Sequence, residues 1–247
     1  VYYLALFAIG AIAMRGAGCT YNDLVDHEID SRVARTRSRP LPSGRVSRIQ
    51  AKIFMVLQSL VGLGVLLQYN GFAIVLGICS LAIVAIYPFA KRITDWPQLF
   101  LGLAFSWGAL MGWAAMFGGL SMAPLLLYAG AILWTIGYDT IYAHQDKEDD
   151  ALVGVRSTAR LFGERTKPWL AAIYTASVAL MALSAYAAGA GWPAYVGLIV
   201  AALLLARQIM VLNIGDPDQC LAHFKANHTV GWIIFLGLLA GAVNNWL

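Results

Sequence analysis

The feature that most constrains this chain is a series of long apolar runs that recurs from its first residue to its last. A transmembrane helix needs about 20 consecutive apolar residues, and eight segments approach or meet that length. They cover residues 1–20, 53–69, 72–90, 97–117, 122–138, 168–187, 192–212 and 229–247. Hydrophobic residues make up 60% of the 247 residues and charged residues only 12%, so a soluble domain could not bury the apolar surface. The sequence predicts an all-α integral membrane protein, a polytopic helical bundle.

Charged residues divide the connections between these spans into two kinds. Three short loops hold none: 70–71, 118–121 and 188–193. All Lys, Arg, Asp and Glu lie in four longer breaks or at the span ends beside them: 21–52, 91–96, 139–167 and 213–228. Basic residues concentrate on the cytoplasmic side of helical membrane proteins. The long breaks are therefore expected to face the cytoplasm of a bacterium, or alternatively the mitochondrial matrix, across an inner membrane.

Two acidic stretches follow inward-running spans that lie four spans apart. The first reads NDLVDHEID at residues 22–30. If the helix continues through it, Asn22, Asp26 and Asp30 share one face at i, i+4 and i+8, with Asp23 beside them. Each acidic stretch is followed by a basic segment, so the chain is interpreted as one domain with a weak internal repeat, 1–138 and 139–247.

The second stretch, DTIYAHQDKEDD, runs from Asp139 to Asp150. On a continued helix, Asp139, Asp146 and Asp150 fall within about one stripe, and Tyr142 lies on the same side. Mg²⁺ prefers a few carboxylates together with substrate phosphate oxygens over a closed protein cage. Carboxylates on two facing helices therefore predict a Mg²⁺ site that is completed by a phosphorylated ligand.

Basic residues near the acidic stretches offer the positive charge that a diphosphate needs. Lys91 and Arg92 end an inward-running span, and Arg39 and Lys147 lie in the flanking breaks. Within a span, Arg15 precedes Asn22 by about two helical turns; an intramembrane arginine by default marks a partner or a ligand.

A metal–diphosphate site at the mouth of a helical bundle leaves room for an apolar tail between the helices or in lipid. An isoprenoid diphosphate meets both requirements, because its headgroup is anionic and each buried CH₂ of its tail contributes about 0.8 kcal/mol. Ionisation of its allylic C–O bond gives a carbocation, to which Tyr138 and Tyr142 are candidates to offer π faces.

Four stretches of the sequence resemble the UbiA superfamily of intramembrane prenyltransferases, and within it the 4-hydroxybenzoate polyprenyltransferases of ubiquinone synthesis. They are MRGAGCTYND (14–23), RTRSRPLPSGRVS (35–47), YPFAKRITDWPQLFLG (87–102) and GYDTIYAHQDKEDDALVGVRSTARLFG (137–163). The resemblance implies nine helices around a central cavity with a cytoplasmic cap. This chain is expected to hold eight of them and to lack the first helix of the family.

The resemblance also implies an activity, the Mg²⁺-dependent transfer of a polyprenyl group from polyprenyl diphosphate to 4-hydroxybenzoate. The new bond forms at the ring carbon ortho to the hydroxyl, and diphosphate is released. Lys91 and Arg92 would contact the diphosphate, and Arg15 would face the benzoate carboxylate. The metal–diphosphate would be held by the residues that match the family's two acidic motifs: Asn22, Asp26, Asp30, Asp146 and Asp150.

Two other functions are compatible with these sequence features. A prenyltransferase of the same kind with another acceptor, such as a dihydroxynaphthoate, homogentisate or a haem precursor, would carry similar acidic motifs. A divalent-cation transporter is a different class, although such sites usually lie near the bilayer midplane and these acids gather at one face. The lipid bilayer is an expected partner and nucleic acid is not; the sequence assigns neither the oligomeric state nor the proton acceptor.

Overall fold

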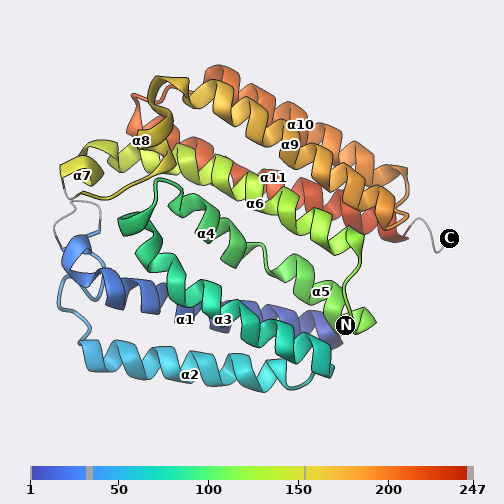
Figure 1. The fold of residues 1–247 in the computed structure, drawn as a ribbon, viewed down its shortest axis with the longest axis horizontal. Helices are drawn as coiled ribbons and strands as arrows, with labels where there is room; N and C mark the ends of the chain where they lie inside the picture. Colours follow the sequence, from blue (N-terminus) through green and yellow to red (C-terminus); the bar gives the residue numbers. More distant parts are fainter. Residues whose placement is uncertain (1, 32–35, 153, 244–247) are drawn as a thin grey trace.

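The computed structural model describes residues 2–31, 36–152 and 154–243, with the side chains of residues 149 and 150 outside that description. Within these residues the chain is helical and contains no strand (Figure 1). The helices are α1 (Tyr2–Asp30), α2 (Arg48–Leu66), α3 (Gly71–Ile93), α4 (Pro97–Phe105), α5 (Gly108–Phe117), α6 (Met122–Ala143), η1 (His144–Asp146), α7 (Lys147–Leu152), α8 (Thr158–Phe162), η2 (Gly163–Arg165), α9 (Thr166–Ala187), α10 (Trp192–Val211) and α11 (Pro217–Val243).

The prediction of eight spans is confirmed, because the described residues contain eight helical segments long and apolar enough to cross a membrane. The fourth span is divided into α4 and α5. The predicted start of the last span, residue 229, is wrong, since α11 begins at Pro217. The Asp216 carboxylate accepts a hydrogen bond from the Gln219 N–H at 3.0 Å, and a proline fits the first turn of a helix. This N-cap extends the helix through polar residues that hydropathy assigns to a loop.

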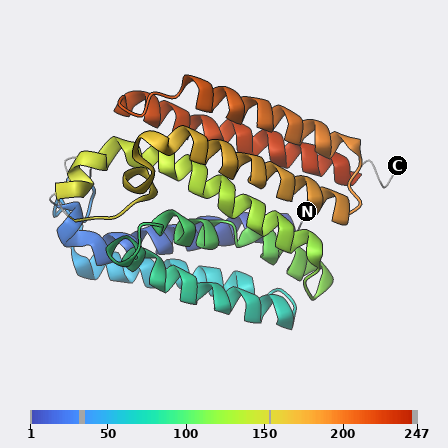
Figure 2. The same ribbon diagram turned by 45° about the horizontal axis from the view of Figure 1, so that its top comes forward.

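The helices run roughly along one direction and form two groups (Figures 1 and 2). One group contains α1 to α5, and the other contains α6, α9, α10 and α11. The second group packs closely: a Cβ added to Gly197 of α10 would lie 2.8 Å from the Gly237 Cα of α11. Small residues allow such close approach between membrane helices.

All the long breaks lie at one end of the bundle, which is called the charged end below. The acidic end of α1, the C-terminus of α3, and η1, α7 and α8 gather there, whereas both described termini lie at the opposite end (Figure 1). The arrangement agrees with the separation of charged and uncharged loops in the sequence, and it brings the two acidic stretches to the same end.

Candidate active site

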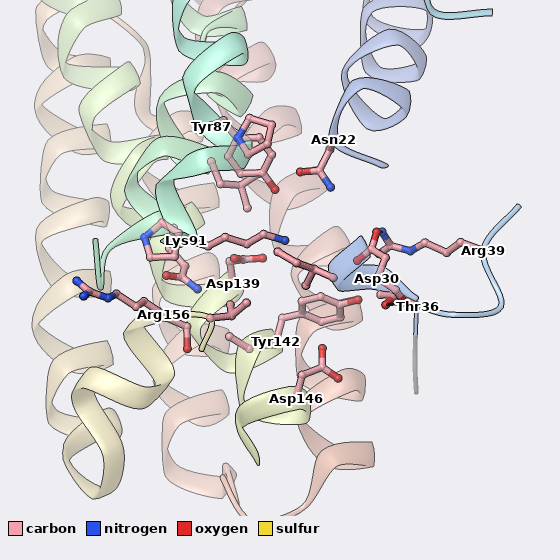
Figure 3. A pocket seen from close by; sticks show the side chains of 18 residues that line it. Asn22, Asp30, Thr36, Arg39, Tyr87, Lys91, Asp139, Tyr142, Asp146 and Arg156 are labelled. Atoms are coloured by element: carbon pink, nitrogen blue, oxygen red, sulfur yellow. Dashed lines mark hydrogen bonds and ion pairs between the residues drawn. The ribbon is translucent and has the colours of Figure 1, made fainter. Parts of the chain in front are cut away.

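A cavity of about 210 Å³ opens at the charged end, and both acidic stretches reach its wall (Figure 3). Asn22 and Asp30 come from α1, whereas Asp139 and Asp146 come from α6 and η1. The structure therefore brings four predicted oxygen donors, from segments more than one hundred residues apart, to one hollow.

Asp26 lies behind this wall in the centre of an ion-pair cluster. Its side chain is fully buried; the Lys91 Nζ lies 2.6 Å from one carboxylate oxygen and the Arg92 Nη2 lies 3.2 Å from the other. The Arg92 Nη2 also donates to the Val25 carbonyl at 3.1 Å. Because α3 supplies both cations, the cluster joins the C-terminus of α3 to α1 and fixes the Lys91 side chain at the cavity, which it lines.

Arg39 joins the loop that follows α1 back to the same helix. Its Nη1 donates to the Asp23 carboxylate at 2.9 Å and to the Asp30 carboxylate at 3.2 Å. The buried Thr36 hydroxyl donates to the Asp30 carbonyl at 2.8 Å. One guanidinium nitrogen therefore bridges two carboxylates that lie about two helical turns apart in sequence, and it ties Arg39 to α1 at the cavity wall.

Sequence reasoning missed part of the opposite wall, including Arg156, Gln98 and Tyr87. The Arg156 backbone N–H donates to the Lys91 carbonyl and its Nη1 to the Ile93 carbonyl, both at 3.0 Å, so this residue satisfies carbonyls at the end of α3. Tyr87 and Arg156 lie in two of the stretches that resemble the UbiA superfamily, YPFAKR and VGVRSTAR, and no spacing pattern within those stretches marks either residue as part of a site.

Among the remaining predicted residues, Lys147 and Arg15 lie away from this cavity wall. Lys147 lines a second cavity beside His144. Arg15 is exposed on α1, with its guanidinium carbon 5.6 Å from the centre of the Phe105 ring of α4. Tyr142 lines the cavity, and Tyr138 follows one helical turn further from the charged end. The side chain of Asp150 lies outside the described residues.

The donors at the cavity suit Mg²⁺ by their chemistry. Among the described residues there is no group of three or more His, Cys, Asp or Glu arranged to hold a metal on its own. Mg²⁺ commonly takes only one or two protein carboxylates and completes its shell with water and substrate phosphates. Carboxylate and amide oxygens beside Lys91 and Arg39 fit such a shared site, and they do not fit a closed structural cage.

Comparisons with known proteins agree on one family. The family model described as the UbiA prenyltransferase family matches residues 2–243. A relative from Aedes aegypti named "4-hydroxybenzoate polyprenyltransferase, mitochondrial" is 49% identical over 98% of this chain and 55% of its own length. Its namesakes from Drosophila melanogaster and Homo sapiens are 49% and 47% identical, over 97% and 99% of this chain and 62% and 66% of their own lengths. The chain therefore spans somewhat more than half the length of these relatives.

Solved structures show the same fold. The apo structure of a UbiA homologue from Aeropyrum pernix K1 matches with a TM-score of 0.84 and 29% identity, over 97% of this chain and 89% of the other. A UbiA homologue from Archaeoglobus fulgidus, described as bound to GPP and Mg²⁺, matches with a TM-score of 0.69 and 18% identity, over 98% and 87% of the two chains.

Proposed function

The chain belongs to the UbiA prenyltransferase family, as its sequence motifs indicated, and from this premise we propose that it prenylates 4-hydroxybenzoate. The reaction moves a polyprenyl group from polyprenyl diphosphate to the ring carbon ortho to the hydroxyl and releases diphosphate, as a step of ubiquinone synthesis. Relatives at 47–49% identity that carry this name support the acceptor. The observation that carries the proposal is the single cavity lined by both acidic stretches and by Lys91.

Headgroup binding follows from the charges around the cavity. Lys91, Arg39 and Arg156 line it and supply the positive potential that attracts a diphosphate. Oxygens of both acidic stretches would hold Mg²⁺: Asn22, Asp30, Asp139 and Asp146, with Asp150 as a further proposed ligand. When bound, the metal neutralises charge on the leaving diphosphate. The donor set supports this role, and the homologue described as bound to GPP and Mg²⁺ has the same fold.

Asp26 has a different role in this proposal from that of a simple metal ligand. It is fully buried between Lys91 and Arg92, so it holds Lys91 in place until the diphosphate arrives. Moving either cation away would leave an uncompensated charge in a buried position, which is energetically costly. The two cations therefore stay in place around the Asp26 carboxylate. Asp26 thereby acts through Lys91, whose position it sets, and not by facing the diphosphate itself.

The transfer step needs a water-poor path for the prenyl carbon. As the C–O bond to diphosphate breaks, the ring carbon of the acceptor attacks, and the ring proton leaves after the new C–C bond has formed. The ring of Tyr142 lines the cavity, and Tyr138 and Tyr142 are proposed to face the electron-deficient carbon. The apolar tail would lie between helices or in the lipid.

Arg15 is proposed to hold the carboxylate of the acceptor. It lies on α1 away from the ion-pair cluster, with its guanidinium beside the Phe105 ring of α4. A guanidinium binds a carboxylate through two parallel hydrogen bonds. The acceptor ring would then lie next to the tyrosines that face the prenyl carbon.

The protein is an integral membrane protein, and we propose that the site faces the cytoplasm or the mitochondrial matrix. The relatives named mitochondrial fit the alternative of a mitochondrial inner membrane better than a bacterial one. The basic residues at the charged end support this orientation of the site.

Reconstituted protein tests the function directly. With Mg²⁺ and a polyprenyl diphosphate, we expect prenylated 4-hydroxybenzoate and little product from dihydroxynaphthoate or homogentisate. Product from the naphthoate and none from hydroxybenzoate would overturn the acceptor assignment. Mg²⁺ flux into proteoliposomes, in the absence of any prenyl transfer, would identify a transporter instead.

A further inference from the structure

Three aromatic residues form a stripe along α6 that begins at the cavity. Tyr142, Tyr138 and Trp134 are spaced four residues apart, so they share one face of the helix, and Tyr142 lines the cavity. A fourth ring, Phe224 of α11, has its centre 4.3 Å from that of Tyr142 and 5.8 Å from that of Tyr138. The Trp134 ring meets Tyr138 edge-on at 5.4 Å. These four residues, called the aromatic stripe below, lead from the cavity along the helix into the bundle.

A buried amide fixes the far end of the aromatic stripe. The Trp134 Nε1–H donates to the Asn227 Oδ1 at 2.9 Å. The Asn227 Nδ2 donates to the His223 carbonyl at 3.0 Å, and only 5% of the Asn227 residue is exposed. With its oxygen and nitrogen both engaged, the amide has one orientation and the indole has one partner. Asn227 and Phe224 share α11, so the same helix turn positions both ends of the stripe.

Resting on the proposed function, we propose that Asn227 is a positioning residue for prenyl transfer. Through Trp134 it holds the Tyr138 and Phe224 rings against the reacting prenyl carbon, so that the acceptor ring reaches this carbon and water does not. Aromatic rings attract a cation only when their faces are presented to it. A rotated Trp134 would release Tyr138 from its edge-on contact and open space that water can enter.

The competing reaction provides the readout. When the C–O bond to diphosphate breaks, the carbon bonds either to the acceptor ring or to a water oxygen. The first outcome gives prenylated hydroxybenzoate, the second gives the free prenol, and each releases one proton and one diphosphate. The fraction of donor that ends as prenol therefore reports which nucleophile reaches the carbon, independently of how much enzyme is folded.

Two variants separate positioning from stability. Asn227→Leu leaves the Trp134 N–H without its partner, which costs stability because the group stays buried. The double variant Trp134→Phe with Asn227→Leu removes both polar groups, and such paired replacement is close to neutral for stability. We expect both variants to raise the prenol fraction roughly threefold, although the melting temperature recovers in the double variant.

Asn70 supplies the matched control. Its Nδ2 donates to the Ala114 carbonyl at 2.8 Å at the opposite end of the bundle, so Asn70→Leu is expected to lower the melting temperature and leave the prenol fraction unchanged. A prenol fraction that stays at the wild-type value in both Asn227 variants, or returns to it together with the melting temperature in the double variant, would overturn the inference. Prenylated product from the wild-type protein is required in either case, so failure of the proposed function is seen separately.

Discussion

The two walls that carry the acidic stretches are built from different interactions. On the α1 wall, charged contacts dominate: Asp26 pairs with Lys91 and Arg92, and Arg39 bridges two further carboxylates. Around α6, packed rings and buried hydroxyls also supply contacts, as between Tyr142 and Phe224. The Thr140 and Thr158 hydroxyls, for example, lie 2.6 Å apart and are fully buried.

This difference indicates how the site responds to a ligand. A charged contact is not specific to its partner, because the Coulomb attraction of Lys91 or Arg39 applies equally to a phosphate oxygen. Close-packed rings and buried hydrogen bonds have no such substitute in a diphosphate. We therefore expect the α1 wall to exchange its ion pairs when the substrate binds and the α6 wall to keep its contacts.

The largest loss of turnover is expected when an acid of either wall is replaced, and one variant tests each wall separately. Asp26→Asn removes the shared partner of Lys91 and Arg92, and Asp146→Asn removes a proposed metal ligand on the other wall. Breaking a buried ion pair costs about 3–5 kcal/mol, and the same energy lost from the transition state slows turnover by roughly a thousandfold. Initial rates with saturating Mg²⁺ check this, together with the amount of each variant in the membrane fraction.

Asp95 is the control for these variants, because it is exposed in the same region of the chain and lies outside the cavity wall. Asp95→Asn is expected to retain the wild-type rate. Near-normal rates for both Asp26→Asn and Asp146→Asn would refute a site shared by the two acidic stretches.

Exchange of ion pairs predicts that metal and diphosphate bind cooperatively. Diphosphate draws Arg39 and Lys91 toward itself and so releases carboxylates for Mg²⁺. Calorimetry with inorganic diphosphate is expected to show at least about tenfold tighter binding when Mg²⁺ is present, a coupling of about 1.4 kcal/mol. Asp30→Asn should keep the affinity for diphosphate alone and lose most of the gain from the metal. If Mg²⁺ tightened diphosphate binding in Asp30→Asn as much as in the wild type, the effect would come from magnesium diphosphate formed in solution and would contradict the prediction.

Much of the fold can be predicted from properties of short, continuous stretches of the sequence. Run length and the absence of charge predict the spans, and the charged breaks predict which end gathers them. The division of the fourth span is different, since no charge or proline marks Ser106 and Trp107 within their apolar run. There, the Trp107 Nε1–H donates to the Leu76 carbonyl of α3 at 3.2 Å. Because hydropathy is averaged over neighbouring residues, it does not reveal a contact with a residue 31 positions away.

The candidate site shows the same limit. Helical spacing correctly places Asp26 and Asp30 together on α1, because one helix continues to Asp30. Beyond residue 143, however, α6 gives way to a 3-10 turn at His144–Asp146, so the helical stripe assumed from Asp139 to Asp150 does not continue in register. The pairing of Asp26 with Lys91 depends on how α3 packs against α1, which spacing along one helix does not determine.

A smaller effect is expected from Arg15, which belongs to neither ion-pair group. Arg15→Ala should raise the KM for 4-hydroxybenzoate roughly tenfold, the typical effect of losing a charge-assisted hydrogen bond, and leave the KM for the prenyl donor unchanged. Arg15→Lys should recover part of the loss, since it keeps the charge without the bidentate geometry. Steady-state kinetics with each substrate varied in turn measure the two constants. A change confined to the donor would contradict the assigned role.

The smallest change in turnover is expected for a variant at the start of α2. This variant tests whether the loop between α1 and α2 is held by the ion pairs of Arg39 or by the N-cap of α2. Ser47 caps α2: its hydroxyl accepts from the Gln50 N–H at 3.2 Å, and the Gln50 side chain accepts from the Ser47 N–H at 2.9 Å. Ser47→Ala should cost about 1 kcal/mol of stability, seen as a lower melting temperature. The turnover rate should stay within about twofold of the wild type, because Arg39 still bridges Asp23 and Asp30. Ser43→Ala, at an exposed position in the same loop, controls for loss of a hydroxyl. A large loss of turnover in Ser47→Ala alone would mean that the cap of α2, and not the Arg39 bridge, holds this loop in place.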